Sequence, residues 1–115
     1  MKKFAYILKA LADEKRVRIL KLLLYRKLCV CEIADILGAT QPAISKHLKK
    51  LRSAGLISCE QDGFWTNYFI ARPKDAHVKV LLRCVNKWLN DDGVVRNDAR
   101  KAKNINRKRL CCKKQ

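Results

Sequence analysis

The hydrophobic positions of this chain follow a helical period first, alternate in the middle, and return to a helical period afterwards. Residues 4–11 place apolar side chains at i, i+3, i+4 and i+7, which predicts an amphipathic helix. Asp13 can cap a second helix. Between residues 17 and 24 this helix is apolar over most of its circumference, as is typical of a helix buried in a bundle. After Pro73, residues 76–89 again follow the period of a helix, which is expected to end near residues 90–93.

Two shorter helices are predicted between these segments. Cys29 and Glu32 have the spacing of a helix capping box, with a thiol in place of the usual hydroxyl. Gly38 is a natural C-terminal residue for this short helix. Thr40 can cap the next helix, which Gly55 ends. A short helix, a tight turn and a second helix with a basic polar face indicate a helix-turn-helix.

Residues 56–61 and 65–70 are β-prone runs that flank Asp62-Gly63, a strong hairpin signal. A hairpin directly after a helix-turn-helix is a wing. The sequence therefore predicts a mainly α protein with a small β-hairpin, a winged helix-turn-helix, over residues 1–92. The helical pattern fails after residue 93, and we expect residues 93–115 to be a flexible basic tail, mostly disordered or a weak helix, that contains Cys111 and Cys112.

The chain has 27 Lys and Arg against 10 Asp and Glu, a formal net charge of +17 over 115 residues. Such a field attracts polyanions, either nucleic acid or an anionic membrane surface. No apolar run approaches the roughly 18 to 20 residues that cross a bilayer. The apolar segment near Met1 is interrupted by Lys9, and charged residues follow where a signal peptide would be cleaved. We expect a cytoplasmic protein, whose six cysteines serve ligation or sensing rather than structural disulfides.

The helix after Thr40 is the one predicted to enter a DNA major groove. The lysine-rich face alone is equally compatible with ordinary solvation, but the turn, the wing and the net charge favour nucleic acid. The predicted DNA-binding residues read base edges, contact phosphates, or lie near the backbone or minor groove. They are Thr40, Gln41, Ser45, Lys46, His47, Lys49, Lys50, Gly63 and Asn67. Trp65 is expected to pack under the hairpin.

Cys29 and Cys31 are candidate ligands for a soft ion. Residues at i and i+2 within a helix point about 200° apart and cannot share an ion. At an N-cap the backbone is still extended, so the two sulfurs can converge there. The helix dipole is expected to lower their pKa values, and two thiolates favour a thiophilic species over Mg²⁺ or Ca²⁺. Alternatively, one of the two cysteines only replaces the usual cap residue, and the other is a small buried hydrophobic residue. Cys59 and Cys84 are expected to be packing residues.

Three segments, 28–34, 40–48 and 51–57, resemble the ArsR/SmtB family of winged-helix metalloregulators, and the likeness spans roughly residues 4–90. The resemblance implies a homodimeric repressor that leaves its operator when a metal binds. The first segment is similar to that of the family's arsenic and cadmium/lead sensing branches. We expect the first and last helices to form the dimer interface, because their apolar residues Phe4, Ile7, Val80 and Trp88 need a partner surface.

The resemblance also bears on the choice of ion. Cadmium/lead sensors complete their site with N-terminal cysteines, and no cysteine precedes Cys29 here. In well-known arsenic sensors a third cysteine sits one turn further along, where this chain has Ala34. The site then uses two sulfurs, or Cys111 or Cys112 supplies a third.

The zinc-sensing branch of the family binds metal between the last helices of the dimer. Asp75 and His77 resemble half of such a site. Trp88 stands at the later His position, although Asp91 could supply the acid. We interpret this pair as a vestige of a zinc site.

We therefore predict a DNA-binding repressor of a metalloid-resistance operon, with As(III) or Sb(III) as inducer. A redox or polysulfide sensor, a Cd, Pb or Zn sensor, and a constitutive nucleic-acid-binding protein are the alternatives. An enzyme is not expected, since the sequence contains no evident nucleophile–base–orienter set.

Overall fold

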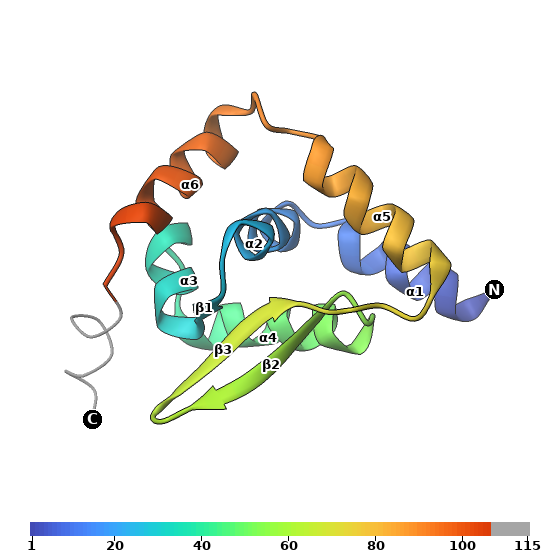
Figure 1. Cartoon of the computed structure of the whole chain (residues 1–115), viewed down its shortest axis with the longest axis horizontal. Coiled ribbons are helices and arrows are strands. Elements are labelled where there is room, and N and C mark those ends of the chain that lie inside the picture. The colour runs from blue at the N-terminus through green and yellow to red at the C-terminus, as the bar shows by residue number, and fades with distance from the viewer. Residues whose placement is uncertain (107–115) are drawn as a thin grey trace.

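The structure, a computed structural model, describes residues 1–106 (Figure 1). It is mainly helical with a small antiparallel sheet, and it confirms the predicted winged helix-turn-helix fold. The elements in chain order are α1 (Lys2–Leu11), α2 (Glu14–Tyr25), β1 (Leu28–Cys29), α3 (Val30–Leu37), α4 (Gln41–Ser53), β2 (Ile57–Asp62), β3 (Trp65–Ile70), α5 (Ala76–Lys87) and α6 (Gly93–Asn104). No helix in the described part of the chain is long and apolar enough to span a bilayer.

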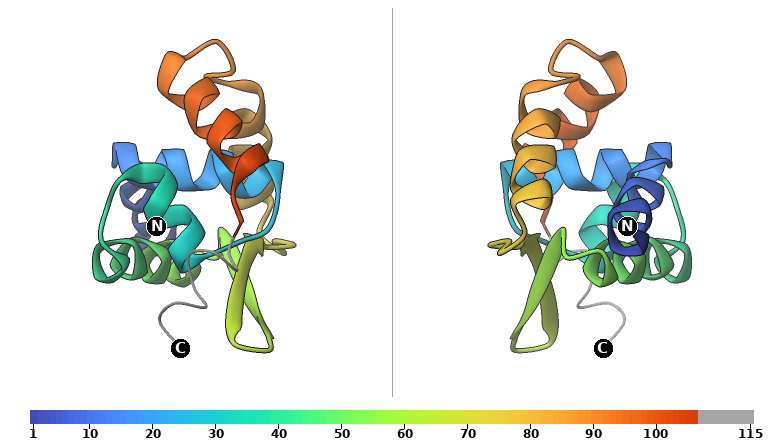
Figure 2. Two further views of the ribbon diagram at one scale, coloured as in Figure 1. Left: turned by 90° about the vertical axis from the view of Figure 1, so that its left-hand side faces the viewer. Right: turned by 90° about the vertical axis from the view of Figure 1, so that its right-hand side faces the viewer.

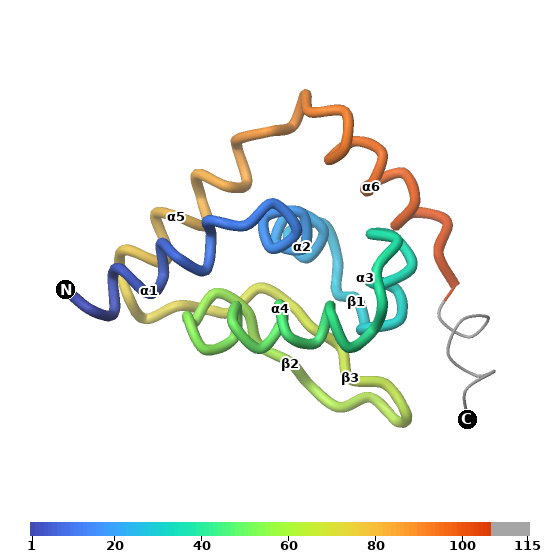
Figure 3. The backbone as a smooth tube through the Cα atoms, turned by 180° about the vertical axis from the view of Figure 1, so that it is seen from behind, coloured from blue at the N-terminus to red at the C-terminus, as the bar shows by residue number. Residues whose placement is uncertain are grey.

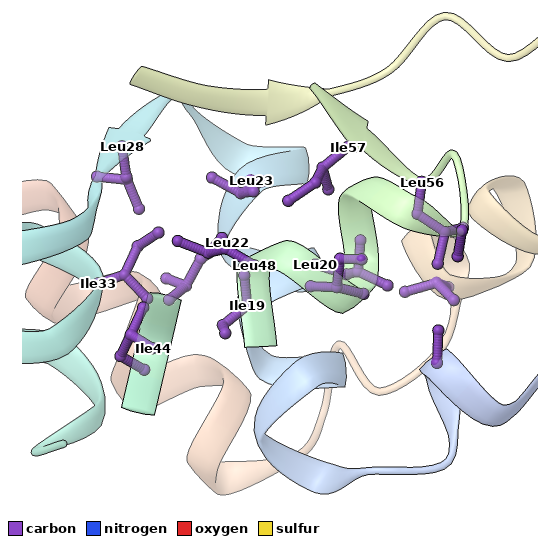
Figure 4. Packing of buried hydrophobic residues seen from close by; sticks show 14 of the residues in the cluster. Ile19, Leu20, Leu22, Leu23, Leu28, Ile33, Ile44, Leu48, Leu56 and Ile57 are labelled. Carbon is purple, nitrogen blue, oxygen red and sulfur yellow. The ribbon is translucent and has the colours of Figure 1, made fainter. Parts of the chain in front are cut away.

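Helix α2 lies at the centre of the fold, with the other helices around it (Figures 1 and 3). Its Ile19 and Leu20 have no exposed surface, and Leu22 is 2% exposed. Figure 4 shows these side chains together with Ile44 and Leu48 of α4. Burying one side chain of this size contributes about 1.5 to 3 kcal/mol, so the α2–α4 contact holds the helix-turn-helix on the bundle.

The turn between α3 and α4 is fixed by local signals at both helix ends. Gly38 follows α3 with φ +66°, the left-handed conformation that favours glycine. Thr40 then caps α4, since its Oγ1 accepts from the backbone N–H of Ala43 at 3.3 Å. Ile33 and Ile44 are fully buried in the core that α3 and α4 share (Figure 4). The predicted helix-turn-helix is confirmed.

The predicted hairpin is also present, with Asp62 paired with Trp65 across Gly63 at φ +62°. The sheet has one more strand than expected. The two-residue β1 adds to the other edge of β3, in the order β1-β3-β2, with Leu28 opposite Tyr68 and Cys29 opposite Asn67. The base of the wing is thereby joined to the segment that leads into α3.

Residues 93–104, expected to be mostly disordered or a weak helix, form a regular helix that packs on the fold. They form α6, which the Asp92 carboxylate caps by accepting from two backbone N–H groups of the first turn. The helix lies against α2 and α3 (Figures 1 and 2), with Ala102 fully buried and Asp98 2% exposed. Residues 107–115, including Cys111 and Cys112, lie outside the described residues.

Helix α5 ends at Lys87, before the predicted end near residues 90–93. Lys21 of α2 stabilises this end, because its ammonium donates to the carbonyl oxygens of Val85 at 3.0 Å and Trp88 at 2.8 Å. Cations placed at a helix C-terminus satisfy carbonyls that have no partner within the helix. The chain then turns through Leu89, whose φ is +66°, toward α6.

Candidate DNA-binding surface and thiol site

Helix α4 separates its residues into two faces as predicted. Ile44, Leu48 and Leu51 are buried against the bundle. The opposite face leaves four of the predicted DNA-binding side chains exposed, namely Ser45, Lys46, Lys49 and Lys50. Gln41 is partly buried in the first turn, and Thr40 is both exposed and the cap of the helix.

His47 has a different environment from the lysines of α4. It is half-buried, and its Nδ1 lies 3.3 Å from the guanidinium of Arg16 in α2. Arg16 is itself held by the carbonyl oxygens of Ala10 at 2.7 Å and Lys9 at 3.2 Å. Burial, together with Arg16, lowers the pKa of His47 against the opposing effect of Asp13. The side chain predicted to read bases therefore also connects α4 to α2.

The wing presents Gly63 at its tip, next to Phe64, whose side chain is 78% exposed. Phe64 is not among the residues predicted from the sequence to bind DNA, although an aromatic residue beside a hairpin glycine is a signal for an exposed tip contact. Asn67 lies further along β3 and donates to the Asp62 carboxylate at 3.4 Å. Trp65 is partly buried in β3.

Cys29 and Cys31 come together at the start of α3. Cys29 is the N-cap and has an extended backbone, with φ −94° and ψ 170°. The two Sγ atoms lie 3.3 Å apart. The capping box is reciprocal. The Glu32 carboxylate accepts from the Cys29 backbone N–H at 2.9 Å, and the Cys29 sulfur accepts from the Glu32 backbone N–H.

The expectation that the pKa of Cys29 is lowered overall by the helix dipole is wrong. Cys29 is 2% exposed, and this burial raises the pKa of its thiol. The neighbouring Glu32 carboxylate raises it further, against the lowering effect of backbone N–H groups at the helix start. Desolvation of a thiolate therefore outweighs the helix dipole at this position.

A third ligand is not provided by the side chains that the structure describes. Among residues 1–106, no group of three or more His, Cys, Asp or Glu side chains could hold a metal ion. Ala34 is buried in α3, whereas Cys59 and Cys84 lie in β2 and α5 and are partly buried. The candidate ligands Cys111 and Cys112 fall outside the described residues.

Asp75 and His77, the pair that resembles half of a zinc site, have structural partners. Asp75 caps α5 by accepting from the His77 backbone N–H at 2.8 Å, and its Oδ1 lies 3.2 Å from His77 Nδ1. The ring of His77 makes an edge contact with Phe4 of α1, with centroids 5.2 Å apart. These contacts join the start of α5 to α1.

Comparison with known proteins identifies the family. Residues 13–58 match the sequence model of the bacterial regulatory proteins of the arsR family. The chain is 34% identical to the arsenical resistance operon repressor of Escherichia coli over 110 residues, which cover 91% of this chain and 92% of that protein. It is 37% identical to an arsenic resistance transcriptional regulator of Pseudomonas putida, over 76% of this chain and 73% of that protein.

The chain belongs to the ArsR family. Solved structures of winged-helix regulators agree with this assignment. Reduced HlyU from Vibrio cholerae is 30% identical with a TM-score of 0.66, and the match covers 77% of this chain and 90% of HlyU. A homodimeric winged helix-turn-helix DNA-binding domain from Mycobacterium bovis is 31% identical with a TM-score of 0.65, over 75% of this chain and 77% of that one.

Membership of the ArsR family makes this protein a DNA-binding transcription regulator, and it explains the exposed basic face of α4 beside a wing.

The residues expected at a dimer surface differ in their exposure. Phe4, Val80 and Trp88 are exposed on α1 and at α5, with Trp88 58% exposed. Ile7 is 1% exposed within the core of its own chain, so the expectation that Ile7 contacts a partner is wrong.

Proposed function

We propose that this ArsR-family protein represses a metalloid-resistance operon and leaves its operator when As(III) or Sb(III) binds Cys29 and Cys31. The observation that carries the proposal is the 3.3 Å separation of the two sulfurs at the N-cap of α3. One soft ion can bridge this separation, since metal–thiolate bonds are about 2.3 Å long. Several relatives are named as arsenical resistance repressors, which supports the same inducer.

Ligand binding would act through the capping box. The Cys29 sulfur accepts a backbone hydrogen bond of α3, and a bound ion competes for the same lone pairs. Loss of a cap costs about 0.5 to 2 kcal/mol. Coupling of 1 to 3 kcal/mol changes DNA affinity by roughly 5- to 150-fold, so the capping box is sufficient in magnitude. Because α3 packs on α4, a change in the first turn of α3 reaches the DNA-reading helix.

The third sulfur of an As(III) site is assigned in this proposal to Cys111 or Cys112. Helix α6 packs on α3, and Asn106 lines a notch that also contains Glu32 of the capping box. Cys111 follows Asn106 by five positions, a length of chain that spans at most about 18 Å. The adjacent cysteines can therefore be connected to this region without a change in the described fold.

We propose further that two copies associate through α1 and α5. The exposed Phe4, Val80 and Trp88 lie on these helices, which run side by side (Figure 3). A dimer presents two copies of α4, as a DNA site with two half-sites requires. The M. bovis relative is described as a homodimer, in agreement with this arrangement.

The test uses DNA selected from a random duplex library by the wild-type protein. Arsenite should lower the affinity of the wild type for this DNA and leave the affinity of the Cys29→Ser/Cys31→Ser variant unchanged. Serine preserves the capping geometry, so the variant should bind DNA as the wild type does without arsenite. Release of the double variant by arsenite would exclude this site. A Cys111→Ser/Cys112→Ser variant that needs more arsenite for release would support the third ligand.

The same sulfur pair supports a second candidate, a redox or polysulfide sensor, because two sulfurs at this distance are close enough to react. HlyU, a structural relative, has been determined in a form called reduced. Release by peroxide or polysulfide at concentrations where arsenite has no effect would select this function. Cd²⁺, Pb²⁺ and Zn²⁺ belong in the same titration, since a relative from Listeria innocua is a cadmium resistance regulator.

A further inference from the structure

The outward face of α6 carries charge of one sign. Arg96, Arg100 and Lys103 are exposed at i, i+4 and i+7, a spacing that places them along one stripe of the helix. The acid of this helix, Asp98, faces inward and is 2% exposed. Both of its oxygens accept from Arg18 at 2.9 Å. The negative charge of α6 is therefore buried and paired with Arg18, whereas the positive charges of Arg96, Arg100 and Lys103 face solvent.

The C-terminal end of α6 forms an open polar notch with the residues that follow α2. Lys103 and Asn104 of α6, Arg26 and Lys27 of the α2–β1 connection, and Asn67 of β3 line it. The carboxylate in the notch, Glu32, accepts from the Cys29 backbone and lies 3.8 Å from Arg26. Cations and amide groups thus predominate in the notch, and its acid already has partners within the chain.

Two cations of the notch, Arg26 and Lys27, have partners within the chain. Arg26 donates to the carbonyl oxygen of Ala102 in α6 at 3.1 Å, which connects the two sides of the notch. Lys27 lies 2.7 Å from the Glu60 carboxylate of β2 and 5.0 Å from the centre of the Phe69 ring. Asn67 of β3 lines the notch together with Lys103 and Asn104 of α6. The notch therefore adjoins the wing.

We propose that this notch binds a backbone phosphate of DNA beside the wing, so that α6 is an additional DNA-contacting element. Phosphate oxygens are acceptors that suit a site of ammonium, guanidinium and amide donors. A DNA phosphate is favoured over a free anion because Asn67 belongs to both the notch and the wing. The chain continues with five Lys or Arg and no acid in residues 107–115. The inference rests on DNA binding by α4 and the wing.

The experiment measures how affinity for the selected duplex depends on salt. A Lys27→Gln/Lys103→Gln variant removes two cations without altering the Arg18–Asp98 pair. If each notch of a dimer holds one phosphate, the variant loses two contacts and the slope of log K against log salt falls by about 1.8. When salt is lowered from 1 M to 0.1 M, the affinity of the wild type should therefore increase about 60-fold more than the affinity of the variant. Hydroxyl-radical footprinting should lose protection on the sugars flanking each half-site.

Two controls separate a local contact from the general field of the protein. Lys87→Gln/Arg96→Gln removes the same charge at the far ends of α5 and α6, and Lys27→Arg/Lys103→Arg keeps the charge of the notch. Both should retain the wild-type slope and footprint to within about half a phosphate contact. Equal slopes for the notch variant and the remote variant would overturn the proposal. A Lys46→Gln/Lys49→Gln variant in α4 tests the underlying function, because its failure to weaken binding would refute the DNA-reading surface itself.

Discussion

Asp98 is the residue that most directly tests how α6 is attached. Its carboxylate is 2% exposed and forms a two-pronged pair with Arg18 of α2, with both N–O distances at 2.9 Å. The hydrogen bonds that the guanidinium donates to this carboxylate raise the pKa of Arg18. If α6 were only loosely associated, this pair would behave as a solvated surface pair and replacing Asp98 would have little effect.

The structure gives the expected magnitude for Asp98→Ala. Removing one partner of a buried ion pair costs about 3 to 5 kcal/mol because the other charge stays buried without compensation. Arg18 keeps 20% of its side-chain surface exposed, so part of its charge is still hydrated. Alanine also favours the helix over aspartate by about half a kcal/mol. We therefore expect a loss of about 2.5 kcal/mol in the free energy of unfolding.

The assay is urea unfolding followed by circular dichroism at one protein concentration, since dimerisation makes stability concentration-dependent. Asp98→Ala, Arg18→Ala and the double variant form a cycle that isolates the pair. A coupling of about 2 kcal/mol is expected, while Arg96→Ala on the exposed face should change stability by less than about 0.5 kcal/mol. A coupling below about 0.5 kcal/mol, the value of an exposed pair, would refute the docking of α6 through this contact.

Two further predictions concern the turn and the recognition helix. Gly38→Ala should lower the free energy of unfolding by about 1 to 2 kcal/mol in urea titration, because φ is +66° at this residue. Gly93 has no positive φ, so Gly93→Ala should leave the free energy of unfolding unchanged or increase it. Equal effects of the two substitutions would contradict the turn geometry. The pKa of His47 is lowered in the folded protein, so the unfolded chain takes up a proton at a higher pH than the folded protein does. The contribution of His47 to stability is therefore present above about pH 6.5 and is lost as the pH falls. Melting temperatures from pH 7.5 to 5.0 should therefore fall more for wild type than for His47→Gln, and parallel curves would show that His47 is not desolvated against Arg16.

The helix-turn-helix and the hairpin were predictable because their signals are local. The Cys29–Glu32 capping spacing, Gly38 and Thr40 each act within four residues, and each has the predicted role in the structure. The convergence of the Cys29 and Cys31 sulfurs also followed from the extended backbone of an N-cap. Short-range geometry of this kind is contained in the sequence and needs little tertiary information.

The packing of α6 on the fold was missed, and at most a weak helix was expected, because its inner face is made of small residues and one acid. Ala102 contributes little hydrophobicity. From the sequence alone Asp98 is expected to face solvent, because its partner Arg18 lies 80 residues earlier in the chain. The pKa of Cys29 was misjudged for a related reason, since the burial that raises it comes from packing between separate elements. Contacts across the chain, rather than local pattern, decide both.

Cys29 belongs to two elements at once, as the N-cap of α3 and as a residue of β1 opposite Asn67 in β3. The helix-turn-helix and the wing are otherwise separate in the sequence, and both are proposed to contact DNA. A rotation of the backbone at this one residue changes the direction in which α3 starts and the pairing that holds β3. The angle between α4 and the wing is therefore set in part by a single buried residue.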